Sequence, residues 1–228
     1  MVMHSSTKYF GGHSDMLGGV LGLNRDIDWP GGVAKAAVEM KMQRLLLGGV
    51  PGSLEGWLTL RSLRTLNMRV RTASENARNL VAWLNGHITS PDPASSASVA
   101  INAVIEKVSH ASLQTDSWLE TQMPNGASPP VFAIVFKKER LARHFPSKLR
   151  LFHHATSLGG VESLVEWRAM SDEHAQMELV RVSVGCEEWV DLRGDLERGL
   201  GELAGWWVEE EKKAAEEGVG KVKEMVLG

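Results

Sequence analysis

The spacing of apolar residues predicts three helices in the first third of the chain. The first covers residues 33–47 and ends at a glycine pair, the second begins at an N-cap serine, Ser53, and the third covers residues 67–84. The third is the most regular, because its apolar residues form one stripe opposite its charged residues: Val70, Ala73, Ala77, Leu80, Val81 and Leu84. We expect this amphipathic helix to pack against a sheet or another lobe.

Short apolar runs predict strands before and between the helices. Residues 1–6 are typical of the end of a strand, and residues 15–23 of a short buried strand interrupted by glycines. Further strands are expected at 99–108, 131–136, 149–154 and 179–184, with an exposed loop at 85–98. A last helix is expected after Glu187, followed by a charged, solvated or frayed tail at 209–224. The mixed order of elements predicts an α/β protein.

Composition excludes several classes of protein. With 228 residues, 43% of them hydrophobic and 23% charged, the chain is expected to be soluble and to form one sizeable core or two modest lobes. A net charge of −3 gives no reason to expect a nucleic-acid or membrane partner. One cysteine, Cys186, can form neither an internal disulfide nor a Cys-rich zinc site. Without an apolar membrane span or signal peptide, the chain is expected to be cytoplasmic.

The first residues carry the most distinctive chemistry. Lys8 lies after two spaced hydroxyl residues, Ser5 and Thr7, and before the pair Gly11-Gly12. A lysine amine can form a Schiff base with an aldehyde cofactor, and in an extended segment the two hydroxyls would point the same way and could donate to a phosphate. The common alternative for such a cluster near a terminus is a solvated loop.

Other site types lack their required residues. The stretch from Gly12 to Asp15 has Met16 where a nucleophile elbow needs glycine, and no glycine-rich phosphate loop is present. His153 and His154 are adjacent, so a strand would place them on opposite faces, which disfavours a metal site. Cys186 is better explained by packing than by nucleophilic chemistry.

Arg181 stands out in the strand predicted at 179–184, because Val180 and Val182 flank it. A half-buried guanidinium is costly unless it meets a carboxylate. Two interpretations stay open: bidentate capture of a substrate α-carboxylate, or an internal ion pair with an acidic residue.

Four segments together resemble the pyridoxal phosphate (PLP)-dependent Cys/Met metabolism family. This family comprises the trans-sulfuration enzymes, among them cystathionine γ-synthase, cystathionine β-lyase and cystathionine γ-lyase. The segments occur in the family's order over nearly the whole chain: Ser5–Asp15 (SSTKYFGGHSD), Leu60–Leu66 (LRSLRTL) with Met68-Arg69, Ser157–Leu164 (SLGGVESL) and Leu179–Gly185 (LVRVSVG).

The resemblance implies roles for five residues. Lys8 would be the Schiff-base lysine that later shuttles protons, Ser5 and Thr7 would hold the cofactor phosphate, and Arg181 with Ser157 would bind the substrate α-carboxylate. The implied fold is the aspartate-aminotransferase-like type I fold. Residues 1–66 would be the end of its large PLP-binding domain and residues 67–228 its small C-terminal domain. The implied substrate is a small sulfur-containing amino acid, and the implied complete enzyme is a homo-oligomer.

Two departures from the family pattern limit these expectations. Family members place the lysine about midway, whereas seven residues precede Lys8 here, so we expect weak cofactor binding and poor turnover by this polypeptide alone. Thr156 stands where γ-acting members carry Glu, which weakens a γ-lyase assignment and leaves β-lyase or synthase chemistry open. Two hypotheses follow: an enzyme active in a longer form or with a partner, or a catalytically inactive fragment that acts at most in an interaction.

Overall fold

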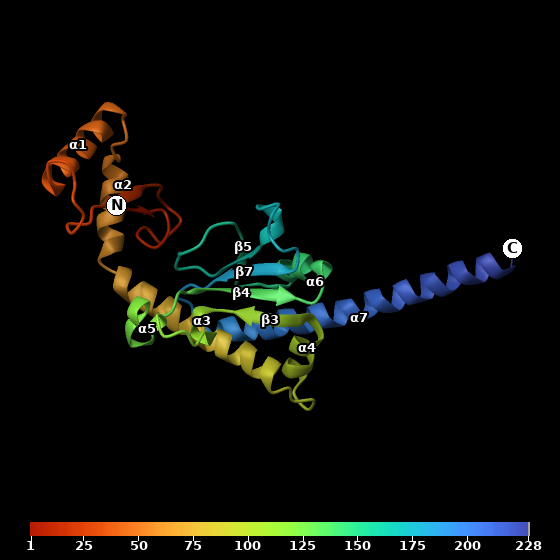
Figure 1. Ribbon diagram of the computed structural model, residues 1–228. Coiled ribbons are helices and arrows are strands. Elements are labelled where there is room, and N and C mark those ends of the chain that lie inside the picture. Colours follow the sequence, from red (N-terminus) through yellow and green to blue (C-terminus); the bar gives the residue numbers. More distant parts are fainter. Residues whose placement is uncertain (228) are drawn as a thin grey trace. The chain divides into compact units, whose positions relative to one another are not determined.

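The computed structural model describes the backbone of residues 1–227 and the side chains of residues 1–124 and 126–216 (Figure 1). Contacts divide the chain into two compact units. Unit 1 contains Met1–Arg71 and the short segment Leu158–Val161, and unit 2 contains Thr72–Ser157 and the residues from Glu162 onward. The assignment of residues 1–66 to a cofactor domain stays a prediction.

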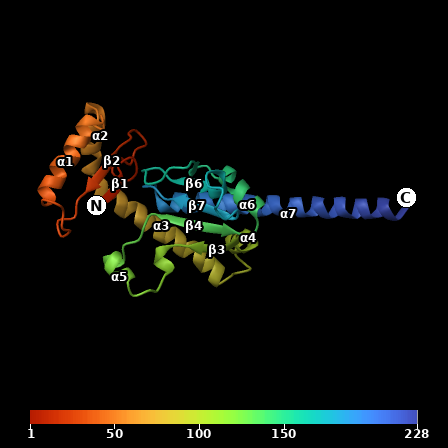
Figure 2. The ribbon, with the colours of Figure 1, turned by 45° about the horizontal axis from the view of Figure 1, so that its top comes forward.

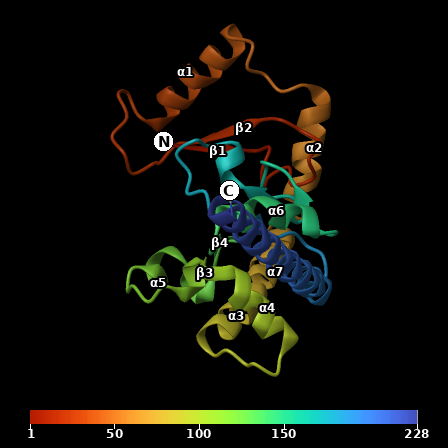
Figure 3. The ribbon, with the colours of Figure 1, turned by 90° about the vertical axis from the view of Figure 1, so that its right-hand side faces the viewer.

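Unit 1 contains a two-stranded ribbon and helices. Strands β1 (Val2–Ser5) and β2 (Gly19–Gly22) pair antiparallel, with His4 opposite Val20. Helices α1 (Val33–Leu46) and α2 (Ser53–Leu63) follow, and α3 (Leu66–Thr89) begins here and continues into unit 2 (Figure 3). The two strand predictions and the three helix predictions for this region are confirmed.

Two details of the expectation for unit 1 are wrong. Strand β2 was expected to be buried, but all four of its residues are exposed. It belongs to a two-stranded ribbon, and the described residues do not cover it. Ser53 is the first residue of α2, and Gly52 before it occupies the N-cap without a side-chain hydrogen bond.

Unit 2 is built on a five-stranded sheet in the order β3-β4-β7-β6-β5 (Figure 2). Its strands are β3 (Ile105–Ser109), β4 (Val131–Phe136), β5 (His153–His154), β6 (Leu164–Trp167) and β7 (Leu179–Ser183). Only β5 and β6 pair parallel; the other pairs are antiparallel. The register sets Arg181 of β7 between Ala133 of β4 and Glu166 of β6.

The core of unit 2 lies between this sheet and its helices. Helices α3, α4 (Ser96–Val104) and α7 (Trp189–Leu227) lie along one side of the sheet in Figure 1. Alternate residues of β4 and β7 are buried in one apolar cluster with the stripes of α3 and α7: Phe132, Ile134, Phe136, Val180, Val182, Leu80, Leu84, Leu192, Leu196, Leu200 and Leu203. Helix α6 (Glu139–His144) and the turn after it add Leu141 and Phe145. The predicted helix stripes and the strands at 131–136 and 179–184 are confirmed.

Two strand predictions in unit 2 need correction, and one strand was not predicted. Residues 105–108 of the strand predicted at 99–108 lie in β3, but residues 99–104 are helical, because the Ser95 hydroxyl accepts a hydrogen bond from the Ser98 N–H and caps α4. That helix and the end of α3 at Thr89 also shorten the loop predicted at 85–98. Strand β5 holds two residues of the predicted 149–154, and β6 was not predicted as a strand.

The charged tail predicted at 209–224 lies in α7. Residues 211–216 are exposed, as expected for a solvated helix, and the side chains from residue 217 lie outside the described ones. Among the described residues, no helix is both long enough and apolar enough to cross a membrane.

The stability of unit 2 is expected to depend on pH through the ionisation of Asp195. Burial opposes ionisation of its carboxylate, but hydrogen bonds from the Leu151 N–H (2.8 Å), Arg198 (2.6 Å) and the Arg150 N–H (2.9 Å) outweigh burial and hold the pKa of Asp195 below its ordinary value. The ionised form therefore stabilises the fold above the unfolded-state pKa, and this contribution is lost as the pH falls below about 4.

We expect Asp195→Asn to lower the free energy of unfolding by about 1–3 kcal/mol at pH 7. The difference from wild type should shrink between about pH 4 and pH 2, as wild-type Asp195 protonates. Urea unfolding followed by tryptophan fluorescence over this range measures it. A difference that stays constant with pH would show that ionisation of Asp195 does not contribute.

Candidate active site

Lys8 lies in a tight series of turns that follows β1. The Gly11 N–H donates to the Ser6 carbonyl oxygen at 2.7 Å, and the Gly12 N–H donates to the Lys8 carbonyl oxygen, also at 2.7 Å. Lys8 is half-buried, while Ser6 is 3% exposed. The predicted extended geometry of Ser5–Thr7 ends at Ser5, because residues 6–11 form turns. Hydrogen bonds within the backbone of the turn therefore fix the position of Lys8 in the chain.

The glycine pair after Lys8 is required by close packing. Gly12 has φ +70°, and a Cβ atom there would lie 2.1 Å from Nη1 of Arg69. A Cβ atom at Gly11 would lie 2.9 Å from Cγ of Met16. A side chain at Gly12 would therefore meet both backbone strain and a clash.

A segment distant in sequence packs on the same turn. Within unit 1, the Val161 N–H donates to the Gly12 carbonyl oxygen at 2.9 Å. Gly159 has φ +80°, and a Cβ atom there would lie 3.0 Å from the backbone nitrogen of Tyr9. The glycine in the Ser157–Leu164 segment is explained by this approach to the Lys8 turn.

The two hydroxyls predicted to hold a phosphate have different surroundings. Thr7 is half-buried, and its Oγ1 accepts a hydrogen bond from the Gly18 N–H at 3.1 Å. Because the hydroxyl acts as acceptor in this bond, its proton can be donated to an anion. Ser5 ends β1 and is exposed. The hydroxyl of Ser6, between them, belongs to a buried residue.

Arg181, in unit 2, is bonded to β6 and to the residues that follow β5, on one side of its strand. Its Nη2 donates to the carbonyl oxygens of Thr156 at 2.9 Å and Ser157 at 2.6 Å. The same nitrogen lies 2.8 Å from Oε2 of Glu166, whose side chain is 1% exposed. The internal ion pair, one of the two interpretations left open by the sequence, is therefore present. The contact with Ser157 also brings together the two residues predicted to bind a carboxylate.

Sequence reasoning did not identify Glu166. It accepts hydrogen bonds from Arg168 at 3.0 Å and from the Ser171 hydroxyl, and the bond to Glu166 raises the pKa of Arg168. The available signal was a single acidic residue in the apolar stretch Leu164–Trp167. A charge in such a stretch is expected to be paired, as Arg181 was.

The described side chains form no cluster of three or more His, Cys, Asp or Glu residues that could hold a metal ion.

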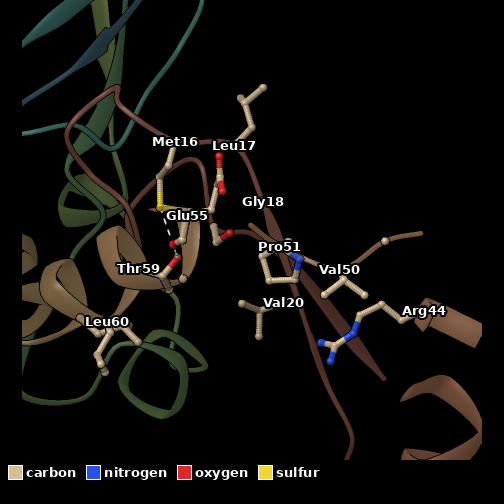
Figure 4. Close-up of a pocket in the computed structure, with 15 residues that line it drawn as sticks. Met16, Leu17, Gly18, Val20, Arg44, Val50, Pro51, Glu55, Thr59 and Leu60 are labelled. Atoms are coloured by element: carbon tan, nitrogen blue, oxygen red, sulfur yellow. Dashed lines mark hydrogen bonds between the residues drawn. The ribbon is translucent and has the colours of Figure 1, made fainter. Parts of the chain in front are cut away.

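Unit 1 also contains a pocket that the sequence did not predict (Figure 4). Its volume is about 500 Å³, and it is lined by residues of the β1–β2 connection, β2, the α1–α2 loop and α2, including Met16, Val20 and Leu60. The dashed line in Figure 4 marks the 3.3 Å contact of the Thr59 hydroxyl with the Met16 sulfur. Arg44 and Glu55 also line it.

Large apolar side chains of unit 1 are unusually exposed. Leu46 and Leu47, at the end of α1, are 81% and 85% exposed, and Met3 of β1 is 80% exposed. Leu54, Trp57 and Leu60 of α2 are exposed as well. Scattered exposed apolar residues are ordinary, but this many in a unit of about 70 residues indicates a surface suited to a partner.

Comparison with known proteins identifies the relatives of this chain. Residues 1–201 match the model of the family described as Cys/Met metabolism PLP-dependent enzyme. The chain is 34% identical over 209 residues to cystathionine gamma-synthase of Mycobacterium tuberculosis, covering 88% of this chain and 48% of that protein. It is 30% identical over 213 residues to cystathionine beta-lyase of Lactococcus lactis, covering 88% and 50%.

The fold gives the same result. The structure of cystathionine gamma-lyase from yeast matches with a TM-score of 0.71 and 28% sequence identity, covering 90% of this chain and 50% of that one. The predicted α/β fold class is thereby confirmed. The chain spans about half the length of the relatives it matches. With a family model that covers most of its length, the chain belongs to the Cys/Met metabolism family of PLP-dependent enzymes.

Proposed function

We propose that this chain contributes the C-terminal half of a PLP-dependent trans-sulfuration enzyme that makes or cleaves C–S bonds of cystathionine-like amino acids. The observation that carries the proposal is the segment around Lys8, in which an amine, the hydroxyls of Ser5 and Thr7 before it and the glycine pair after it occur together in a chain of this family. The enzyme is proposed to act in the cytoplasm on a small sulfur-containing amino acid and, in its complete form, as a homo-oligomer.

The residues of the turn fit the aldehyde and phosphate of pyridoxal phosphate. The Lys8 amine would hold the aldehyde carbon, and the Ser5 and Thr7 hydroxyls would donate to phosphate oxygens. The Thr7 proton is available because its oxygen already accepts from the Gly18 N–H. When bound, the cofactor supplies an electron sink for the bonds next to the substrate amino group. Once a substrate amine displaces it, the Lys8 amine can accept and return protons at Nζ.

Arg181 and Ser157 are proposed to hold the substrate α-carboxylate. A guanidinium is suited to this because its planar fork matches a carboxylate. The bond from Arg181 to the Ser157 carbonyl oxygen and the ion pair with Glu166 support the proposal, since they fix the guanidinium before any substrate binds.

We infer the type of C–S chemistry from one position, residue 156. Thr156, where γ-acting members carry Glu, is exposed and its carbonyl oxygen accepts from Arg181. We therefore favour synthase or β-lyase chemistry over γ-lyase chemistry. The relatives described above include a synthase and a β-lyase, and the structurally similar yeast protein is a γ-lyase.

A second candidate function is an inactive fragment that acts through an interaction. The exposed apolar residues of unit 1 favour it, because such a surface suits a partner whether or not catalysis follows. The same surface serves the first candidate, in which the other half of the family's length packs on unit 1. Chemistry at Lys8 separates the two candidates.

We expect pyridoxal phosphate added to the purified chain to produce a visible absorbance band that depends on Lys8. Lys8→Ala should remove the band because no other amine lies beside the Ser5 and Thr7 hydroxyls in this turn. Lys35→Ala is the matched control, since Lys35 is 62% exposed and lies outside the turn. A band that Lys8→Ala leaves unchanged would contradict the enzyme proposal and favour the inactive fragment.

We also expect Glu166→Ala to lower the free energy of unfolding by about 3–5 kcal/mol, since Arg181 and Arg168 would lose the buried carboxylate between them. Glu173→Ala is the control, because that side chain is 90% exposed and its removal should change stability by less than about 0.5 kcal/mol. Chemical denaturation measures both. Equal effects of the two substitutions would show that Glu166 does not anchor Arg181.

A further inference from the structure

The segment Leu60–Leu66 with Met68-Arg69 has no role in the function proposed above, although it carries part of the family resemblance. In the structure it ends at a half-buried arginine, Arg69, in the first turn of α3. The guanidinium of Arg69 donates to residues 59 and 60 positions earlier in the chain. Those residues are the two that directly follow Lys8.

The contacts of Arg69 join the Lys8 turn to the end of α2. Its Nη1 donates to the Tyr9 carbonyl oxygen at 2.9 Å. Its Nη2 donates to the carbonyl oxygens of Phe10 at 3.4 Å and Ser62 at 2.9 Å. Its Nε donates to the Thr65 hydroxyl at 3.1 Å. One side chain thus joins the backbone after Lys8 to the end of α2 and the residues that lead into α3.

The surroundings of Arg69 are built to receive it. Gly12 leaves room for the guanidinium, since any Cβ atom there would lie 2.1 Å from Nη1. On the other side, the Ser62 residue is 2% exposed, and the Thr65 N–H and hydroxyl also donate to its carbonyl oxygen, at 3.1 and 3.2 Å. Ser62, which Arg69 links to the turn, is therefore itself fixed by hydrogen bonds.

Only arginine suits this arrangement. A guanidinium presents five N–H donors in a rigid plane, whereas a lysine ammonium is a compact point charge on a flexible stem. Hydrogen bonds from a charged donor are about twice as strong as neutral ones. The guanidinium can donate to all three carbonyl oxygens and the hydroxyl that surround its plane. An ammonium group does not have the geometry to do so.

We propose that Arg69 is a positioning residue that fixes the Lys8 turn and so sets how readily the Lys8 amine reacts with an aldehyde. The chemical part of this inference rests on the proposed function. The Lys8 amine condenses with the aldehyde of pyridoxal phosphate and releases water, and borohydride reduces the resulting C=N bond to a stable amine. The amount of label on Lys8, found by peptide mass spectrometry, therefore reports the reactivity of that one amine.

The test compares Arg69→Met and Arg69→Lys with wild type and with Arg64→Met. Arg64 is an exposed arginine of the same segment and serves as the matched control. Two quantities are measured in each protein: hydrogen exchange of the Gly11 and Gly12 amides, which donate within the turn, and the label on Lys8 relative to Lys35. Exchange of amides in β4 and α7 shows whether a change is confined to the turn.

We expect Arg69→Met to speed exchange at Gly11 and Gly12 at least tenfold, to leave β4 and α7 unchanged and to lower the Lys8 label several-fold. Arg69→Lys should resemble Arg69→Met, because the charge is kept and the fork is lost, and Arg64→Met should resemble wild type. If Arg69→Met does not fold, the same two measurements on Arg69→Lys test the inference.

Wild-type exchange at Gly11 and Gly12 in the Arg69 variants would overturn the inference. So would faster exchange with an unchanged Lys8 label, since Arg69 would then stabilise the turn without affecting its chemistry. Failure of the proposed function looks different: Lys8 of the wild-type protein would be labelled no more than Lys35. The exchange rates would still show whether Arg69 holds the turn, and the chemical role of Arg69 would be rejected.

Discussion

The close packing of backbone around Lys8 is the constraint on which the candidate site of unit 1 depends. The turn is approached by the guanidinium of Arg69 at Gly12 and by a second segment at Gly159; a Cβ atom would clash at Gly12 and would lie only 3.0 Å from the Tyr9 backbone nitrogen at Gly159. Both glycines also have positive φ, so two separate requirements exclude other residues. A lysine on such a backbone loses little further freedom when it reacts, which is the advantage of a site organised in advance.

Unit 2 uses a different means to hold a charged group. Arg181 is placed by the register of β7 against β6, and Glu166 faces it as a direct cross-strand neighbour. A buried carboxylate shared by two arginines is costly to desolvate, so it contributes more to the placement of Arg181 than to net stability. The sheet that carries it is anchored by the apolar cluster against α3 and α7.

Much of this could be predicted from the sequence, for local reasons. The amphipathic stripe of α3 and the apolar run of β4 are strong periodic signals, and both were located correctly. The strand predicted at 99–108 was right for residues 105–108, which lie in β3, and wrong for residues 99–104, where a capping hydroxyl at Ser95 outweighs the β preference of the valine and isoleucine residues. Strand β2 was expected to be buried because local glycines and apolar residues do not show how many layers cover them.

The residues that carry the proposed chemistry were predicted from the sequence. The residues that hold them in place were not. Lys8, Ser5, Thr7, Ser157 and Arg181 were named from residue chemistry and the family resemblance, and their roles stay proposals. Glu166 and the contacts of Arg69 join residues 15 and 60 positions apart, which no local pattern reveals. Residues that act through others are found only when the fold brings them together.

The most direct test is whether the response of the chain to a substrate depends on the proposed carboxylate-binding residue Arg181. L-Cystathionine is added to the chain with bound pyridoxal phosphate, and the change in the Lys8-dependent absorbance is followed in wild type, Arg181→Met and the exposed control Arg150→Met. The account predicts that Arg181→Met needs roughly 10 to 100 times more amino acid for the same change, as expected for loss of a charged hydrogen bond to a carboxylate, while Arg150→Met resembles wild type. The same concentration dependence in all three proteins would contradict it.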